Sequence, residues 1–367
     1  MLQPRPNVQS LMPCSHGGPD LTELAGLGLS PEDLLDFSVN CNPFGPPPGV
    51  KAAAERASWE RLPDSQSTGL RQALAAALGV TRASIVIGNG SVELIRCLSL
   101  AFFGPGDAVV VAGPTFGEYE TSLLIAGATP THYRAPQQEG FRPDPGVLAG
   151  LLSEARGLFL CNPNNPTGVY LSREEIAAVA RAATESLLVL DEAYMPFVEG
   201  AWNSLELLER GNVMVLRSMT KDYALGGLRL GYAVGAEPLM DALRKVLPPW
   251  NVNAVAQEAG LLAVEDPGYP ARCLPAIIDA RDYLVAALGS LGLSPLPSRT
   301  NFFLVEVGDA PSFRRALLRE GFLVRDCTSF GLPSHVRISA RTLPECERLV
   351  EAVRRVLARL SQSAGGA

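Results

Sequence analysis

Residues 213–232 read VMVLRSMTKDYALGGLRLGY, and this stretch decides the fold class. It opens with a short apolar run, VMVLRS, of the kind that forms a strand buried on both faces. Similar runs occur at 84–88, 107–113, 128–134, 157–162, 187–192 and 230–235, with helix-like segments at 91–103, 117–126, 172–183 and 204–210. Such alternation is typical of βα units. We therefore expect an α/β fold with a mostly parallel seven-stranded sheet.

The character of the chain changes after Pro248-Pro249, where helical periodicity is followed by short strands and a terminal amphipathic helix. This pattern predicts a smaller α+β domain behind the large one. We expect three parts: an N-terminal arm with part of the small domain at 1–45, a large domain at 46–270, and a C-terminal small domain at 271–367.

Composition excludes several classes of protein. The net charge is −7 and the lysines and arginines are scattered, which argues against a nucleic-acid partner. No apolar run is long enough to cross a membrane, and the N-terminus has no secretory pattern, so we expect no membrane partner and a cytoplasmic protein. The seven cysteines form no C-x-x-C pair and there are three histidines, so we predict no metal site.

The ends of the predicted strands carry unusual polar residues. Ligands of open α/β sheets bind at the carboxyl ends of the strands. Gly88-Asn89-Gly90-Ser91 follows the first strand and opens a helix, whose free N–H groups suit a phosphate. Asn162, Asp191 and Lys221 each stand at or after a later strand, at spacings of 29 and 30 residues. One βα unit takes about that many residues, so we expect these side chains to converge.

These residues together predict a cofactor. The chain has three lysines (Lys51, Lys221 and Lys245), and a desolvated lysine can form a Schiff base with an aldehyde. A buried carboxylate needs a cation, and a protonated pyridine nitrogen can supply it. Arg229 adds a fixed cation suited to a phosphate. Amine, carboxylate and phosphate cradle are what pyridoxal 5'-phosphate (PLP) requires.

The motifs S-x-x-K, G-L-R-L-G-Y, N-P-N-N-P-T-G and D-E-A-Y occur in an order that resembles the class I/II aminotransferase family of PLP fold type I. The resemblance implies that Lys221 is the cofactor-binding and proton-shuttling lysine and that Asp191 pairs with the pyridine nitrogen. It also implies that Asn162 and Tyr194 hold the ring hydroxyl and that Phe116 stacks on the ring. The cofactor phosphate would be bound by Gly90, Ser91, Ser218 and Arg229, and a substrate carboxylate by Arg337.

Motifs near the N-terminus indicate a particular group of enzymes within this family. Ser15-His16-Gly17-Gly18 and the run from Leu35 to Gly45 look like the opening of the threonine-phosphate decarboxylases of cobalamin biosynthesis. We therefore expect decarboxylation of L-threonine O-3-phosphate to (R)-1-amino-2-propanol phosphate. By resemblance, the substrate-binding candidates are His16, Ser38, Asn40, Asn162, Arg325 and Arg337. The family also implies a homodimer, although Leu62 replaces a tyrosine that reaches across the dimer in relatives.

Two alternatives stay open at this point. Whether the Cα–COOH or the Cα–H bond breaks depends on which stands perpendicular to the cofactor plane, and sequence does not show that pose. An aminotransferase acting on histidinol phosphate or another amino acid is therefore the alternative enzyme. A catalytically dead module that keeps the PLP fold is the alternative from another class, and the retention of Lys221 argues against it.

Overall fold

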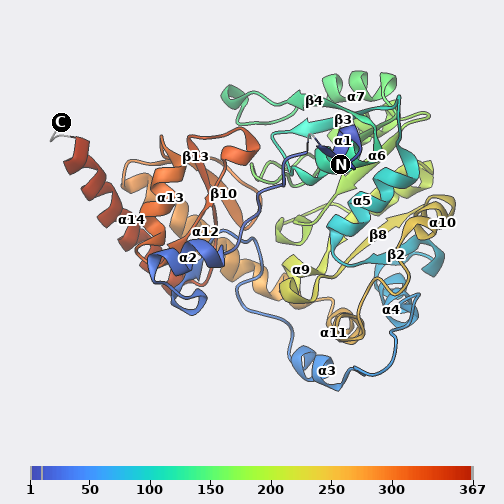
Figure 1. The fold of residues 1–367 in the computed structure, drawn as a ribbon, viewed down its shortest axis with the longest axis horizontal. Helices are drawn as coiled ribbons and strands as arrows, with labels where there is room; N and C mark the ends of the chain where they lie inside the picture. Colours follow the sequence, from blue (N-terminus) through green and yellow to red (C-terminus); the bar gives the residue numbers. More distant parts are fainter. Residues whose placement is uncertain (1, 10, 365–367) are drawn as a thin grey trace.

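The computed structural model describes residues 2–9 and 11–364, which form a large domain and a small domain (Figure 1). The large domain holds a sheet with helices on both faces, as the strand pattern predicts. Within the described residues this sheet has seven strands in the order β2-β8-β7-β6-β5-β3-β4. They are β2 (Ile85–Gly88), β8 (Gly231–Gly235), β7 (Val213–Ser218), β6 (Leu187–Asp191), β5 (Gly157–Cys161), β3 (Ala108–Gly113) and β4 (Thr129–Arg134).

The expected mostly parallel sheet is confirmed, with one reversal. β7, β6, β5, β3 and β4 run parallel, whereas β8 is antiparallel to both β7 and β2. Because β8 returns beside β7, the segment between them folds back at the same edge of the sheet. That segment contains Lys221 and Arg229.

Alternate residues of β7 face opposite sides of the sheet, and both sides are buried. Val213 and Val215 belong to one apolar cluster, whereas Met214 and Leu216 belong to another. The helices that cover the sheet and complete the large domain are α3 (Val50–Arg56), α4 (Thr68–Leu78), α5 (Ser91–Phe102), α6 (Glu118–Ala126), α7 (Pro145–Glu154), α8 (Arg173–Ala182), α9 (Met219–Asp222), α10 (Glu237–Val246) and α11 (Ala254–Glu265). Burial on both faces explains why the strands read as continuous apolar runs.

The small domain is built from two short sheets and three main helices. Its strands are β1 (Leu35–Asp36), β9 (Ser294–Pro295), β10 (Phe302–Glu306), β11 (Phe322–Leu323), β12 (Arg325–Asp326) and β13 (His335–Ser339). Its helices are α12 (Tyr269–Ser290), α13 (Ala310–Leu318) and α14 (Leu343–Ala364). Tyr269, at the start of α12, packs against the cores of both domains, so this helix joins them.

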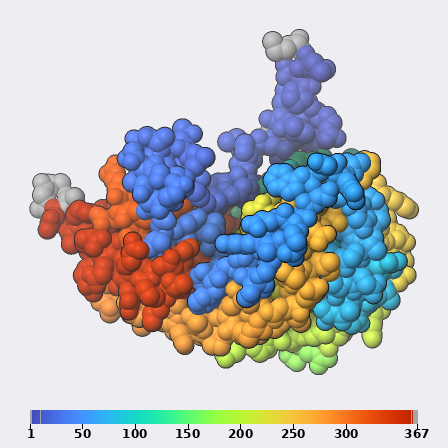
Figure 2. Space-filling model, turned by 90° about the horizontal axis from the view of Figure 1, so that it is seen from below, coloured from blue at the N-terminus to red at the C-terminus, as the bar shows by residue number. Residues whose placement is uncertain are grey.

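The N-terminal residues belong to both domains. Helix α1 (Pro6–Gln9) contacts α6 of the large domain, whereas α2 (Leu21–Leu27) packs through Leu24 on Leu318 and Leu323 of the small domain. Strand β1 pairs with β11, and Figure 2 shows these blue N-terminal residues seated against the red C-terminal part. Residues 11–17 cross between the domains, and we call them the strap. The boundaries at 45 and 270 stay predictions.

No helix among the described residues is long and apolar enough to cross a membrane.

Candidate active site

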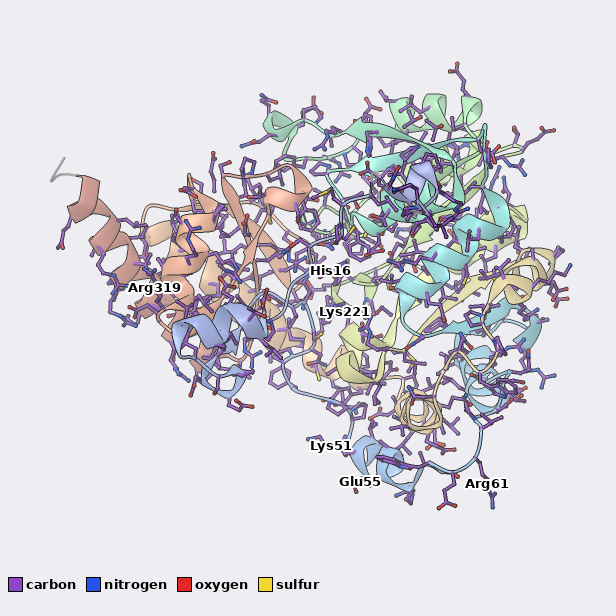
Figure 3. All side chains as sticks on the ribbon, viewed as in Figure 1. His16, Lys51, Glu55, Arg61, Lys221 and Arg319 are labelled. Atoms are coloured by element: carbon purple, nitrogen blue, oxygen red, sulfur yellow. The ribbon has the colours of Figure 1, made fainter. Side chains whose placement is uncertain are left out.

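A cleft of about 1380 Å³ lies between the two domains, at the carboxyl edge of the large sheet. Figure 3 shows His16 and Lys221 in the middle of the molecule, whereas Lys51 lies at its periphery. The structure thus brings most of the predicted site residues together. Those that line the cleft are His16, Ser38, Asn40, Ser91, Phe116, Asp191, Tyr194, Ser218, Lys221, Arg229, Arg325 and Arg337.

Asp191 ends β6 at the cleft wall, and its side chain is held by two donors. The Tyr119 hydroxyl donates to Oδ2 at 2.7 Å, and the Ala193 N–H donates to Oδ1 at 3.0 Å. Burial raises the pKa of Asp191 above its ordinary value. A protonated ring nitrogen at the cleft side would offset that cost, because an opposite charge favours the ionised carboxylate.

Lys221 stands on the single turn of α9, directly after β7. Its Nζ lies 6.0 Å from the centroid of the Tyr194 ring. Tyr194 is itself fixed by an edge-to-face contact with Phe302 of the small domain, with ring centroids 4.9 Å apart. The backbone carbonyl of Lys221 accepts from Asn42 N–H at 2.8 Å, which fixes the turn from the N-terminal side. The lysine amine and the tyrosine hydroxyl therefore belong to one side of the cleft.

The turn after β2 forms an anion cradle with Arg229. Gly90 has φ of +77°, and a Cβ on it would lie 2.9 Å from Arg229 Nη2, so only glycine leaves this approach free. Ser91 begins α5, where free N–H groups favour an anion. Ser218 Oγ lies 2.6 Å from Thr220 Oγ1, and both hydroxyls line the same cleft. These groups suit a phosphate.

Phe116 lies at the cleft wall beside two other rings. Its ring meets Tyr119 edge-on, with centroids 5.7 Å apart, and the His16 ring lies 5.9 Å away. Tyr119 in turn stacks on Phe159 at 4.9 Å. Phe116 is therefore an aromatic surface available to a planar ring in the cleft.

Asn162 and Gly90 are predicted residues that do not line the cleft; Gly90 lies behind Arg229, whereas Asn162 belongs to a loop. The Asn162 side chain bridges that loop, donating to the Leu171 carbonyl at 3.1 Å and accepting from the Leu171 N–H at 2.7 Å. Both ends of the amide are thus used internally. Asn165, three residues further along N-P-N-N-P-T-G, lines the cleft and accepts from Arg337 Nη1. The cofactor role expected for Asn162 stays a prediction, and Asn165 is the amide of this run that lines the cleft.

The small domain contributes two buried arginines that already donate to protein oxygens, although Arg337 Nε has no partner among the described residues. Arg325 donates to the carbonyls of Ser15 and His16 at 2.7 and 3.0 Å and to two serine hydroxyls. Arg337 donates to Asn165 and to the Ser38 carbonyl. Burial lowers the pKa of Arg325. Both residues remain substrate-binding predictions, but their contacts in this structure are to the protein itself.

Ser38 and Asn40 line the cleft from the N-terminal segment, and they differ in their hydrogen bonding. Ser38 Oγ donates to Asp36 and accepts from the Gly18 N–H, so it holds the end of the strap. Asn40 is 1% exposed, and among the described residues neither its Nδ2 nor its Oδ1 has a hydrogen-bond partner. Buried amides without partners are costly. Asn40 therefore offers both a donor and an acceptor to a bound molecule.

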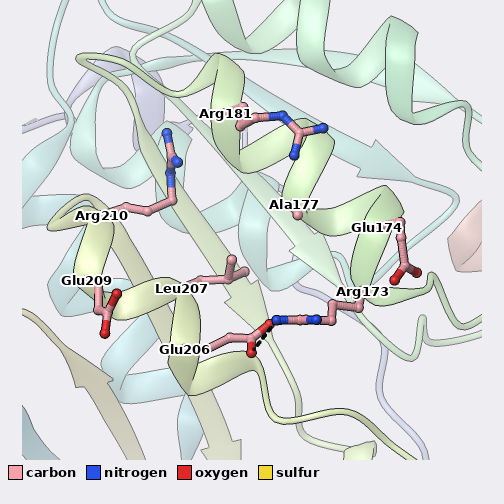
Figure 4. Close-up of a pocket in the computed structure, with 8 residues that line it drawn as sticks. All are labelled: Arg173, Glu174, Ala177, Arg181, Glu206, Leu207, Glu209 and Arg210. Carbon is pink, nitrogen blue, oxygen red and sulfur yellow. Dashed lines mark hydrogen bonds and ion pairs between the residues drawn. The ribbon is translucent and has the colours of Figure 1, made fainter.

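Two other hollows do not carry this chemistry. The surface groove in Figure 4, about 780 Å³, lies between α8 and the 3₁₀ segment Ser204–Arg210, and arginines and glutamates line it together with Ala177 and Leu207. Arg173 pairs there with Glu206. A smaller hollow of about 560 Å³ adjoins the cleft beside Arg325. Neither contains a lysine, and no group of metal-ligating side chains occurs in the part of the chain that is described.

Comparison with known proteins identifies the family. Residues 32–353 match the model of aminotransferase class I and II, so the chain belongs to that family. The histidinol-phosphate aminotransferase of Moorella thermoacetica is 35% identical over 96% of this chain and 93% of its own. A solved histidinol-phosphate aminotransferase of Sinorhizobium meliloti, in complex with pyridoxal-5'-phosphate, is 27% identical with a TM-score of 0.85, covering 97% of both chains.

The chain is therefore an enzyme of PLP fold type I, and its cofactor is PLP. The site fits that group: the Gly90 cradle would be filled by a Cβ, and buried Asp191 has room for a cation on its cleft side. Bound PLP supplies an electron-withdrawing ring to the substrate's amino carbon.

The expectation of threonine-phosphate decarboxylation is wrong. Relatives that are 34–36% identical over 90–98% of this chain are named histidinol-phosphate aminotransferases. A solved L-threonine-O-3-phosphate decarboxylase of Porphyromonas gingivalis is 26% identical with a TM-score of 0.79, covering 88% of this chain and 99% of its own. The expectation rested on a short N-terminal motif, whereas these relatives match almost the whole length. The assignments to the lyase class and to cobalamin biosynthesis depended on the decarboxylation, so they are not supported either.

Sequence reasoning also missed residues of the cleft. Glu118, which is 3% exposed, accepts from His16 Nε2 and from Arg96 Nη2, each at 3.0 Å. Tyr119 holds Asp191. Both residues stand in the run G-P-T-F-G-E-Y at 113–119, which follows the strand at 107–113, so a search of the residues after that strand would have found them. Arg96 and Asn165 carried no such signal, because one is mid-helix and the other is one asparagine among several.

Proposed function

We propose that this enzyme is an aminotransferase that acts on histidinol phosphate. The observation that carries the proposal is the near full-length similarity to enzymes of that name. The mechanism needs an amine that leaves one substrate and enters another, with a proton moved at the carbon concerned. The cleft holds residue types for each of these tasks.

On the cofactor side, the proposed roles follow from position. Asp191 keeps a proton on the pyridine nitrogen, because its buried carboxylate needs a positive partner. Lys221 Nζ binds the cofactor and carries the proton to and from the amino carbon, as an amine freed on substrate binding can. Tyr194 and Asn165 hydrogen-bond the ring hydroxyl, and Phe116 covers the ring. Gly90, Ser91, Ser218 and Arg229 hold the cofactor phosphate.

On the substrate side, Arg337 is the proposed carboxylate ligand and Arg325 the proposed ligand of a second anionic group. Asn40 contributes the amide that has no partner among the described residues. His16 of the strap and Ser38 after β1 shape the pocket. The proposal includes a small phosphorylated amino substrate, and it includes a homodimer. Exposed Trp59 and Leu62, 84% and 70% exposed, support such an interface.

The test is to load the protein with PLP and add histidinol phosphate with a 2-oxo acid acceptor, following the keto product. Turnover with the acceptor and none without it supports the proposal. A matched reaction with an unphosphorylated, unrelated amino acid donor measures selectivity. If histidinol phosphate gives less than about a hundredth of the turnover of another amino acid donor, the substrate assignment is wrong. Sedimentation of a fully active monomer would refute the homodimer.

A further inference from the structure

The single turn of α9 that carries Lys221 receives two hydrogen bonds from a distant residue. The last carbonyls of a helix have no partner within it, and a helix of one turn has few bonds of its own. Here the Lys221 carbonyl accepts from the Asn42 N–H at 2.8 Å, and the Asp222 carbonyl accepts from Asn42 Nδ2 at 3.0 Å. The backbone and the side chain of Asn42 thus hold two adjacent carbonyls of the lysine turn.

Asn42 is itself fixed in orientation. The residue is 4% exposed, and its Oδ1 accepts from the Phe44 N–H at 3.0 Å, as in an Asx turn. This bond settles which end of the amide is the oxygen, so the NH₂ group faces the Asp222 carbonyl. The side chain of Asn42 therefore cannot rotate without losing a bond at each end.

Residues 37–42 connect this contact to the small domain. Phe37 is 0% exposed and belongs to the apolar cluster of that domain. Its N–H donates to the Leu323 carbonyl at 2.8 Å, and its carbonyl accepts from the Ser339 N–H at 3.0 Å. The chain consequently runs from the small-domain core at Phe37 to the lysine turn at Asn42 within five residues.

The backbone after Lys221 adopts a conformation that depends on its surroundings. Ala224 has φ of +52°, in the left-handed region that side chains with a Cβ rarely adopt. The Ala224 N–H reaches the Lys221 carbonyl at 3.4 Å, which is longer than the bond from Asn42. Strained backbone persists only where neighbouring contacts hold it. Asn42 supplies two such contacts immediately before the strained residue.

We propose that Asn42 is a positioning residue for Lys221. By holding the carbonyls of Lys221 and Asp222, it fixes the direction from which the lysine amine enters the cleft, where Nζ lies 6.0 Å from the centroid of the Tyr194 ring. A shift of the small domain reaches the lysine turn through the same contact. This inference rests on the role of Lys221 in the proposed function, but it does not depend on which amine is the substrate.

The first experiment separates kcat from KM. In Asn42→Ala we expect kcat to fall about tenfold, the effect of one buried hydrogen bond on the barrier, while KM for the amino donor changes less than about threefold. Asn42→Ser keeps an acceptor for the Phe44 N–H but is too short to reach the Asp222 carbonyl. We expect Asn42→Ser to lose as much kcat as Asn42→Ala. Recovery of wild-type kcat in Asn42→Ser would show that the Asx turn alone matters and would overturn the inference.

The matched control is Asn212→Ala. Asn212 directly precedes β7, at the opposite end of the strand from Lys221, and its Nδ2 donates to the carbonyls of Ala183 and Ser186. This variant also removes an asparagine amide that holds main-chain carbonyls, so we expect a similar loss of thermal stability with kcat kept near wild type. An equal loss of kcat in Asn42→Ala and Asn212→Ala would assign the effect to general destabilisation and overturn the inference.

A second pair of readouts needs no turnover. In the PLP-loaded enzyme, hydrogen exchange of the peptide covering residues 219–225 reports how firmly the lysine turn is held. The visible circular dichroism of the bound cofactor, per mole bound, reports how firmly Lys221 orients it. We expect faster exchange and a weaker visible band in Asn42→Ala, and wild-type values of both in Asn212→Ala. Wild-type values of both in Asn42→Ala would show that Asn42 does not position Lys221.

The two proposals fail differently. A wild type that does not act on histidinol phosphate refutes the proposed function. Hydrogen exchange and the circular dichroism of the cofactor use no substrate, so they still decide the role of Asn42.

Discussion

The two walls of the cleft hold their charged groups in opposite ways. On the sheet wall, Asp191 is fixed by a phenol and a main-chain N–H, and Lys221 stands on a turn tied to Asn42. On the small-domain wall, Arg325 and Arg337 donate to the backbone carbonyls of residues 15, 16 and 38. These residues lie outside the seven-stranded and the four-stranded sheet.

This difference separates a permanent site from an exchangeable one. The sheet wall is preorganised for one resident group, because burial and short bonds fix every partner before that group binds. The arginines of the other wall keep their charge satisfied by oxygens that a substrate anion can replace. An aminotransferase takes two substrates in turn, and we infer that exchangeable partners suit that wall.

The largest expected effect is on the sheet wall. Lys221→Ala should reduce turnover by about 10⁴-fold or more, because it removes both the nucleophile and the proton carrier. Lys51→Ala, at the periphery of the molecule, is the control and should keep full activity. Steady-state rates with PLP-saturated protein test this, with circular dichroism to confirm folding. Retention of more than about a hundredth of the activity would move the role to another lysine.

The next effect concerns the buried carboxylate. Asp191→Asn keeps an acceptor for Tyr119 but removes the charge, so we expect kcat to fall by about 10²- to 10³-fold. Tyr119→Phe removes one hydrogen bond and keeps the charge, so its loss should stay below about tenfold. Equal losses in the two variants would show that geometry, rather than charge, is what Asp191 supplies.

A smaller effect separates the two asparagines. Asn165→Ala removes the cleft amide that accepts from Arg337, so it should raise KM about tenfold and also cost about 1–3 kcal/mol of stability. Asn162→Ala breaks both bonds to Leu171 and should cost about 1–2 kcal/mol of stability while KM stays near wild type. Denaturant unfolding and steady-state kinetics on both variants test the contrast. The reverse pattern would return Asn162 to the site.

The smallest effect is on stability near Lys221. Burial raises the pKa of Asp222 to about 7. Between its ordinary pKa and 7 the folded state holds a proton that the unfolded state has lost, so wild-type stability falls as pH rises through this range. Asp222→Asn keeps an acceptor for the Tyr223 N–H and removes this loss. We expect it to be more stable by about 1–2 kcal/mol at pH 8, since partial exposure screens the charge, and equal near pH 4.

Thermal unfolding at both pH values checks the Asp222 prediction. A constant difference between variant and wild type across pH would show that shape, rather than ionisation, is responsible.

The residues of the sheet wall could be predicted from sequence because each is marked by the apolar run next to it in the chain. Each of Ser91, Asp191 and Lys221 ends or follows an apolar run, and parallel strands bring their ends together without further information. Sequence alone does not show which of the three asparagines of this run faces the cleft, because that depends on the loop's bonds to Leu171.

The other wall could not be predicted in this way. His16 meets Glu118 across 102 residues, and Arg325 meets Ser15 across 310. Such contacts depend on how the strap crosses between domains, and no periodicity records that path. The reaction was predicted wrongly because the expectation rested on the short H-G-G start, whereas the relatives named histidinol-phosphate aminotransferases match nearly the whole chain.

The reversed strand β8 also decides how the anion cradle is assembled. Within the described sheet β2 has β8 as its sole neighbour, with Gly88 opposite Gly231. Without β8, β2 would keep its contacts with the helices α4 and α5 but would have no strand to join it to the rest of the sheet. Because Gly90 follows β2 and Arg229 precedes β8, the pairing of these two strands is what brings the two sides of the anion cradle together.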